Sequence, residues 1–203
     1  MKSIVLVIVI LFSSLADPAH APLKISLANS TPNEVKVKAQ LERLLKTYDM
    51  SKWIATPSII IDEKTTIPHS HPVLTINTRH IKDDELLVST FVHEQMHWFV
   101  DRDEKKLEAA MVELKKMFPD APAGPPEGAR DQASTYLHVG VCYLEYRALR
   151  ELMGELKAKQ VMEFWSTDHY KWVYRTVLER PRDIGTIMFK YDLVPTEPKK
   201  SLK

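Results

Sequence analysis

The sequence has little of several features that would each indicate a particular class of protein. It contains one cysteine, Cys142, so no intramolecular disulfide can hold the fold together. Five glycines in 203 residues exclude a collagen-like or glycine-rich chain. The 28 Lys and Arg residues are balanced by 27 Asp and Glu residues, which leaves no basic excess for sequence-independent binding of nucleic acid. With 44% hydrophobic residues, the chain is expected to form a compact domain stabilised by packing, with or without a metal.

An apolar run lies near the start of the chain. Lys2 precedes the uninterrupted apolar residues 4–12, and small residues follow as far as Ala16. This order is typical of a secretory signal peptide, and the run is about half of the roughly 20 residues that a membrane-spanning helix requires. We therefore predict a signal peptide over residues 1–16, with cleavage after Ala21 as the alternative. The mature protein is expected to be periplasmic or secreted and to have no stable membrane span.

The rest of the sequence alternates short β-branched runs with longer amphipathic stretches. Residues 33–48 have the apolar spacing of a helix, which Asn33 is expected to cap. Two short strands are predicted at 58–61 and 73–76, with a proline-containing loop or wide hairpin between them. An almost wholly apolar helix is predicted from Asp83 to Val100, and further helices follow at about 107–117, 131–153, 161–165, 168–178 and 181–188.

These elements predict one α+β domain that is dominated by helix. The domain is expected to cover residues 17–196, with residues 17–32 as an extended lead-in. Residues 197–203 form a basic, proline-containing segment that we expect to be a disordered tail.

The apolar helix contains a motif with specific chemistry. His93, Glu94 and His97 form an H-E-x-x-H pattern. Residues four apart lie about 40° apart around an α-helix, so both imidazoles point from one face and can bind one zinc ion at about 2.0–2.1 Å. Glu94 lies about 100° from His93, close enough to act as general base on a water molecule at the metal. Three ionisable side chains on so apolar a helix would be costly to bury without such a partner.

The extended motif resembles that of the zincin metallopeptidases. Residues 90–99 read Thr-Phe-Val-His-Glu-Gln-Met-His-Trp-Phe, with Thr90 three residues before the first histidine and uncharged residues through the turn. The predicted order of a sheet, this helix and then further helices is also the zincin layout, over roughly residues 33–178. The resemblance implies a zincin-like α+β fold, a catalytic Zn²⁺ and hydrolysis of a peptide bond by zinc-activated water, with Glu94 as the base.

A catalytic zinc normally has three protein ligands, so a third is required. Glu145 lies 48 residues beyond His97 in a second predicted helix, where gluzincin-type enzymes carry their third ligand. We predict Glu145 as that ligand, with an arginine ion pair as the alternative. Asp103 stands where metzincins place theirs, but Val100 occupies the position at which those chains need a glycine. His138, on the same helical face as Glu145, remains a ligand, a group that polarises the substrate carbonyl, or a core histidine.

Three further side chains are candidates to stabilise the oxyanion that forms when water attacks a carbonyl group. The resemblance implies a Tyr, His or Arg in this role, and His169, Tyr170 and Tyr174 lie close together in the sequence. The alternative is an aromatic stripe that packs in the core. Cys142 has no base to activate it, so we expect a buried structural thiol.

These observations together predict a secreted or periplasmic zinc metallopeptidase that acts on a peptide or protein substrate. The strand at 73–76 is the expected edge to which an extended substrate would add. Two alternatives stay open: a non-catalytic zincin-fold binding or inhibitory protein of the cell envelope, and a zinc amidase that acts on a cell-wall substrate. The presence of Glu94 favours an enzyme, because a structural zinc site needs no base.

Overall fold

The computed structural model describes residues 23–197, so the predicted signal peptide and all of the predicted tail except Glu197 lie outside the described residues. The described part is mostly helical α+β, as predicted. No helix within it is long and apolar enough to cross a membrane. Its elements are β1 (Lys24–Leu27), α1 (Pro32–Thr47), the short 3-10 helix η2 (Ser51–Trp53), β2 (Ser58–Ile61), β3 (Leu74–Ile76), α2 (Asp84–Val100), α3 (Glu104–Met117), α4 (Gln132–Met153), α5 (Glu155–Asp168), α6 (Lys171–Glu179) and α7 (Pro181–Lys190).

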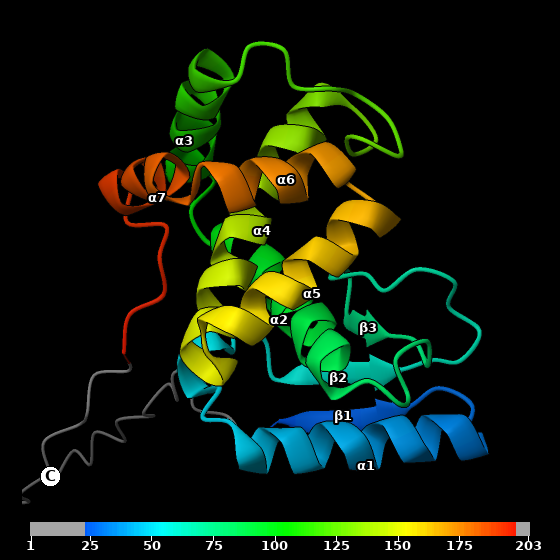
Figure 1. Ribbon diagram of the computed structural model, residues 1–203. Coiled ribbons are helices and arrows are strands. Elements are labelled where there is room, and N and C mark those ends of the chain that lie inside the picture. Colours follow the sequence, from blue (N-terminus) through cyan, green and yellow to red (C-terminus); the bar gives the residue numbers. More distant parts are fainter. Residues whose placement is uncertain (1–22, 198–203) are drawn as a thin grey trace, which may run out of the picture.

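Helix α2 runs through the middle of the molecule. Figure 1 shows the strands and α1 at one end and α3, α6 and α7 at the other, and α2 packs against α1, β3, α4 and α5. Asp83 caps α2 as predicted, because its side chain accepts a hydrogen bond from the backbone nitrogen of Leu86 at 2.9 Å. The burial of this helix confirms the predicted core helix, and its fully buried apolar residues are Leu87, Val88, Phe91, Val92, Met96 and Val100.

The three strands form one parallel sheet in the order β1-β2-β3. Ile25 pairs with Ile59, and Ile59 pairs with Leu74. This arrangement corrects two predictions. β1 lies in the segment that we expected to be an extended lead-in, because four residues at a half-buried sheet edge give only a weak pattern. β2 and β3 are parallel, so residues 62–73 cross over between them and do not form a hairpin.

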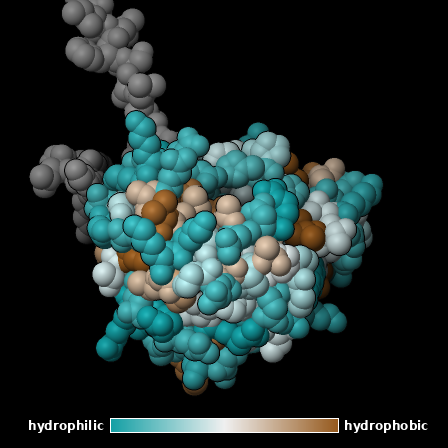
Figure 2. All heavy atoms as spheres, turned by 90° about the horizontal axis from the view of Figure 1, so that it is seen from above, coloured by the Kyte–Doolittle hydropathy of each residue, from teal (hydrophilic) through white to brown (hydrophobic). Residues whose placement is uncertain are grey.

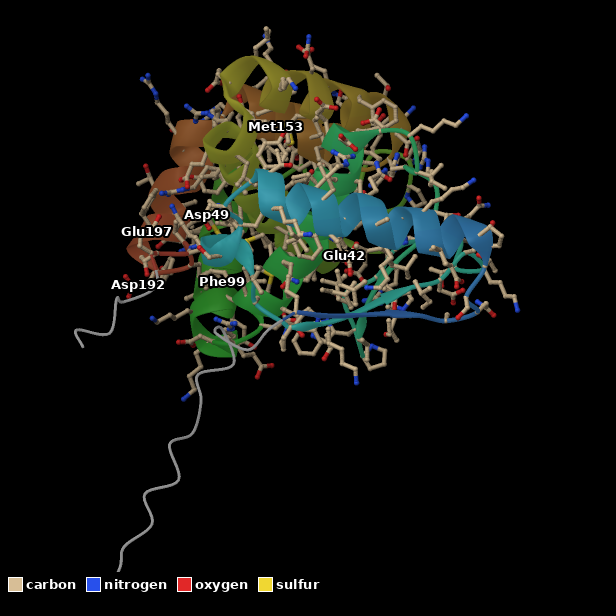
Figure 3. All side chains as sticks on the ribbon, turned by 90° about the horizontal axis from the view of Figure 1, so that it is seen from below. Glu42, Asp49, Phe99, Met153, Asp192 and Glu197 are labelled. Atoms are coloured by element: carbon tan, nitrogen blue, oxygen red, sulfur yellow. The ribbon has the colours of Figure 1, made fainter. Side chains whose placement is uncertain are left out.

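Helix α1 begins slightly earlier than its apolar pattern predicts. Its N-cap is Thr31 and not Asn33, because Thr31 and Glu34 exchange side-chain to backbone hydrogen bonds in a capping box. Figure 3 shows α1 on the outside of the molecule as seen from below, with Glu42 on its exposed side. The preceding residue, Leu41, is fully buried. The helix therefore covers the sheet end of the core with one apolar face.

The residue after Glu94 in the motif connects α2 to the chain that leads into β2. Gln95 is fully buried. Its side-chain oxygen accepts hydrogen bonds from the backbone nitrogens of Ala55 and Thr56 at 2.7 and 2.8 Å, and its amide nitrogen donates to the Thr56 carbonyl at 3.0 Å. Because buried backbone groups have to be paired, Gln95 fixes this segment against the helix that carries the histidines.

We expect Gln95→Leu to lower the free energy of unfolding by about 2–4 kcal/mol, because the new side chain leaves two buried backbone groups of Thr56 and one half-buried group of Ala55 without partners. Urea denaturation of the metal-free protein, followed by circular dichroism, measures the change. The matched control is Gln160→Leu, since Gln160 is exposed on α5 and its replacement should change stability by less than about 0.5 kcal/mol. Equal stabilities of the two variants would contradict the proposed role of Gln95.

Candidate metal centre

Three imidazole rings converge where α2 packs against α4. His93 and His97 lie one turn apart on α2, and His138 comes from α4. The ring centroids of His93 and His97 are 5.0 Å apart, and the centroid of His138 is 5.8 Å and 5.0 Å from them. One nitrogen atom from each ring lies within 4.8 Å of the other two. The packing of the two helices thus adds His138 to the pair that the motif predicted.

The ring nitrogens are arranged to receive a cation. Nε2 of His93 and Nε2 of His97 are 3.3 Å apart. A tetrahedral zinc ion with bonds of about 2.0–2.1 Å holds its ligand nitrogens about 3.3–3.4 Å apart. Nδ1 of His138 lies 2.7 Å from the Ser134 carbonyl oxygen, which can only accept, so the proton is on Nδ1 and the Nε2 lone pair is free. These residues therefore fit a bound metal ion.

Glu145 lies behind His93, on the side of the ring away from His97. Its carboxylate accepts hydrogen bonds from His93 Nδ1 at 2.9 Å, from the Tyr174 hydroxyl at 3.2 Å and from the Ser89 hydroxyl. The side chain is fully buried. With its Nδ1 proton directed at Glu145, His93 presents Nε2 to the other histidines. Glu145 as a metal ligand stays a prediction, and its carboxylate already has three donors.

A second group of metal-binding side chains lies on the Nδ1 side of the His93 ring. The sulfur of Cys142 is 4.0 Å from His93 Nδ1, and together with Glu145 these residues offer three donor atoms within 4.8 Å of one another. Burial raises the pKa of the Cys142 thiol, which opposes formation of the thiolate that a metal requires. The three histidines line a cavity, whereas Cys142 is not among the described residues that do. Because the three histidines are open to the cavity and Cys142 is not among the described residues that line it, the three-histidine group is the better candidate for the metal site.

Glu94 faces the same cavity, which has a volume of about 760 Å³. Its side chain is 7% exposed, and burial raises its pKa to about 7. A carboxyl group with a pKa near neutrality is suited to accept a proton from water and to pass it on. Burial also lowers the pKa of His97, which keeps that ring neutral and able to bind a metal.

Tyr170 is held over His138 at the wall of the cavity. The two ring centroids are 4.3 Å apart. The Tyr170 backbone has φ 47° and ψ 41°, in the left-handed region that bulky side chains rarely adopt. The next two backbone nitrogens donate to the carbonyl groups of Pro126 and Glu127 at 2.9 and 3.0 Å, so the loop before α4 supports this conformation. Backbone strain of this kind is common at functional sites.

His169 lines the same cavity, but its ring is hydrogen-bonded to the carboxylate of an ion pair. Its Nδ1 is 2.8 Å from the Asp168 carboxylate, which Arg79 also binds through contacts of 2.5 and 3.1 Å. Hydrogen bonding from Arg79 lowers the pKa of Asp168 to about 2, so this carboxylate only accepts. Burial lowers the pKa of His169, and its neutral ring then has its one proton on Nδ1. Of these two predicted residues, Tyr170 has the free donor for an oxyanion.

Two other candidates from the sequence lie away from the donor nitrogens. Asp103 caps α3 by accepting a hydrogen bond from the backbone nitrogen of Lys106 at 3.2 Å, and it is not among the described residues that line the cavity. Tyr174 is 2% exposed and directs its hydroxyl at Glu145. Its hydroxyl therefore supports the carboxylate and is not free to donate to an oxyanion, although the residue also lines the cavity.

Two residues of the site were not predicted from the sequence. Ser89 donates to Glu145, and the indole nitrogen of Trp165 donates to the Ser89 hydroxyl at 2.8 Å. Ser89 stands four residues before His93, on the same side of α2, and this spacing is a signal that could have identified it. Trp165 comes from α5 and carried no such signal.

The sequence matches no family model, and no curated protein or solved structure matches it significantly. The functional argument therefore rests on the site itself. The described residues contain a buried group of three histidines, with Cys142 and Glu145 behind His93, that can bind a metal ion.

Proposed function

We propose that this protein is a zincin-like zinc-dependent hydrolase, and specifically a metallopeptidase. One observation carries the proposal: three imidazole nitrogens converge within 4.8 Å in a cavity that Glu94 also lines. A structural zinc site is normally closed by four protein ligands, whereas a catalytic site has three and leaves one position open. Three histidines with an adjacent carboxylate at a cavity have the composition of the catalytic kind.

The proposed ligands are His93, His97 and His138, and this set revises the sequence prediction at one position. Glu145 orients the His93 ring and is not itself a proposed ligand, because its carboxylate is already occupied by three hydrogen-bond donors. His138 has its Nδ1 bound to a carbonyl oxygen and its Nε2 free. The proposed ligand stands on the same predicted helix as Glu145, two turns earlier.

Two polar side chains in the cavity, those of Glu94 and Tyr170, act directly in the proposed hydrolysis of a peptide bond. When bound, a zinc ion supplies Lewis-acid chemistry at these nitrogens. Glu94 takes a proton from the attacking water, whose oxygen bonds to the carbonyl carbon. Glu94 then delivers the proton to the amine nitrogen as the carbon–nitrogen bond breaks. The Tyr170 hydroxyl donates a hydrogen bond to the carbonyl oxygen as negative charge develops there.

An extended substrate would add to residues 66–70 and not directly to β3. β3 is an edge of the described sheet, but Thr75 exchanges backbone hydrogen bonds of 3.1 and 2.8 Å with His69 in an antiparallel bridge. The segment at residues 66–70 therefore covers β3 at this point and itself lines the cavity. We propose strand addition at this outer segment.

The proposed location is the periplasm or the extracellular medium, and the residue order of the first 16 positions supports it. Peptide and amide hydrolysis by a three-ligand zinc site use the same groups. A cell-wall amide therefore remains the second substrate class, and it belongs in the same assay.

Removal of zinc is expected to abolish hydrolysis. The mature protein should be assayed on denatured protein, on a peptide library and on purified cell-wall fragments, before and after dialysis against a chelator and after zinc is restored. Activity should disappear with the metal and return with it, because the histidines only donate electron pairs and cannot replace the metal as a Lewis acid. Zinc-loaded, folded protein that cleaves none of these substrates would contradict the proposed function and favour the non-catalytic binding protein.

A further inference from the structure

The cavity continues past the metal-binding histidines into a recess lined by aromatic rings. From His138 the ring contacts run through Tyr170 and His169 to Trp165, with centroid separations of 4.3, 4.7 and 5.0 Å. His80 lies beyond, with its ring 5.3 Å from that of Trp165 and perpendicular to it. All of these residues line the cavity. We call this part the aromatic recess and define it by Arg79, His80, Trp165, Asp168, His169 and Tyr174.

His80 has polar ring atoms that no described residue pairs. The residue is 7% exposed, and its backbone oxygen accepts a hydrogen bond from the Gln40 amide at 3.3 Å. Its ring nitrogens have no hydrogen-bond partner among residues 23–197 and are open to the cavity, because the one buried side-chain atom without a partner in this part of the chain is Oε1 of Gln40. Burial lowers the pKa of His80 to about 4, so the neutral ring offers one donor and one acceptor. A polar group of a ligand would complete this pairing.

The two charged side chains of the recess, Arg79 and Asp168, neutralise each other. Arg79 binds both carboxylate oxygens of Asp168, and its guanidinium carbon lies 6.0 Å from the centre of the Trp165 ring. The pair leaves no free charge to compensate an ionised group, so a charged side chain would be costly to bury here. Trp165 is 4% exposed. The face of the molecule shown in Figure 2 is mostly hydrophilic. The recess is therefore suited to an uncharged ring that enters from the cavity.

We propose that the aromatic recess binds the substrate side chain next to the cleaved bond, and that His80 selects an uncharged aromatic side chain with a hydrogen-bonding edge, such as tyrosine. This inference rests on the proposed metallopeptidase function. Phenylalanine would occupy the same space but would leave His80 unpaired. A hydrogen bond that only one of two otherwise similar ligands can form favours that ligand by up to about tenfold.

A binding experiment tests this inference without requiring turnover. The probes are two peptide hydroxamates that differ only in tyrosine or phenylalanine beside the hydroxamate, and calorimetry with zinc-loaded Glu94→Gln protein measures their affinities. We expect the tyrosine compound to bind about tenfold more tightly, the effect of one hydrogen bond. His80→Phe in the same background should reduce the ratio to about one, while His80→Gln, which keeps a donor and an acceptor, should retain part of it.

The control variant is His71→Phe, because His71 stacks on Trp98 outside the recess and should leave the ratio unchanged. Zinc content and circular dichroism establish that each variant is folded. Equal affinities for the two compounds, a preference that His80→Phe does not alter, or no binding by zinc-loaded protein would overturn the inference about the recess, even if peptides are cleaved. A preference that depends on His80 in a protein without hydrolytic activity would support the recess and contradict the proposed function.

Discussion

Replacing His138 with alanine is expected to remove zinc from the purified protein under conditions in which the native protein holds about one ion per chain. Zinc sites with four protein ligands gain about 10–16 kcal/mol from metal binding. Loss of one of three ligands should therefore cost at least about 3 kcal/mol, which is more than a hundredfold in affinity. Competition with a chelator of known affinity, followed by metal analysis, measures this effect. His93→Ala and His97→Ala should behave in the same way.

Variants of Glu145 and Asp103 test the proposed set of three histidine ligands against the two carboxylate ligands that the sequence offered as alternatives. Glu145→Gln should weaken zinc binding about 10–100-fold, as is usual for groups that hydrogen-bond to a ligand, and Asp103→Ala should leave it unchanged. X-ray absorption of the zinc-loaded protein should show three imidazole nitrogens at about 2.0–2.1 Å. Two imidazoles with one carboxylate, together with full zinc retention by His138→Ala, would restore Glu145 as the third ligand.

The part of the site that the sequence predicts is the part formed within one helix. The spacing of His93 and His97 fixes their relative direction as soon as the segment is helical, and the apolar residues around them establish that it is buried. The third ligand depends instead on how α4 crosses α2. His138 and Glu145 lie two turns apart on one face of α4, and sequence spacing places both near α2 without specifying which one brings its donor atom close to both His93 and His97.

The same distinction between local and non-local structure explains the errors in the fold. β2 contains three consecutive isoleucines and was predicted, whereas β1 is a short edge strand that becomes recognisable only through its pairing with β2. The segment at 168–178 was predicted as one helix, but α5 ends at Asp168 and α6 begins at Lys171. The break arises because carbonyl groups of a distant loop hold the backbone after Tyr170. It is also what places Tyr170 beside His138.

Glu94→Gln is expected to lower kcat/KM by about 10²–10⁴-fold while the protein keeps its zinc and its fold. The amide has the size of the carboxylate but cannot take a proton from water. Assays on the best substrate from the hydrolysis screen, with metal content measured on the same samples, give this result. The matched control is Glu108→Gln, because Glu108 is exposed on α3 and should leave kcat/KM unchanged.

The pH dependence of any hydrolysis by the native protein provides a second test of the proposed role of Glu94. Burial raises the pKa of Glu94 to about 7 in the absence of a metal ion, and a metal cation bound to the histidines would lower it. A general base acts only when it is deprotonated, so kcat/KM should fall as the pH decreases through this pKa, on a limb that lies below pH 7.

The residual rate of Glu94→Gln should lack this acidic limb over the range in which zinc stays bound. Loss of zinc at low pH would produce a similar fall, because protonation of the histidines releases the metal. Metal analysis at each pH separates the two causes. An acidic limb that persists unchanged in Glu94→Gln with zinc still bound, or a kcat/KM within tenfold of the native value, would show that another group takes the proton, and Glu94 would lose its role as the base.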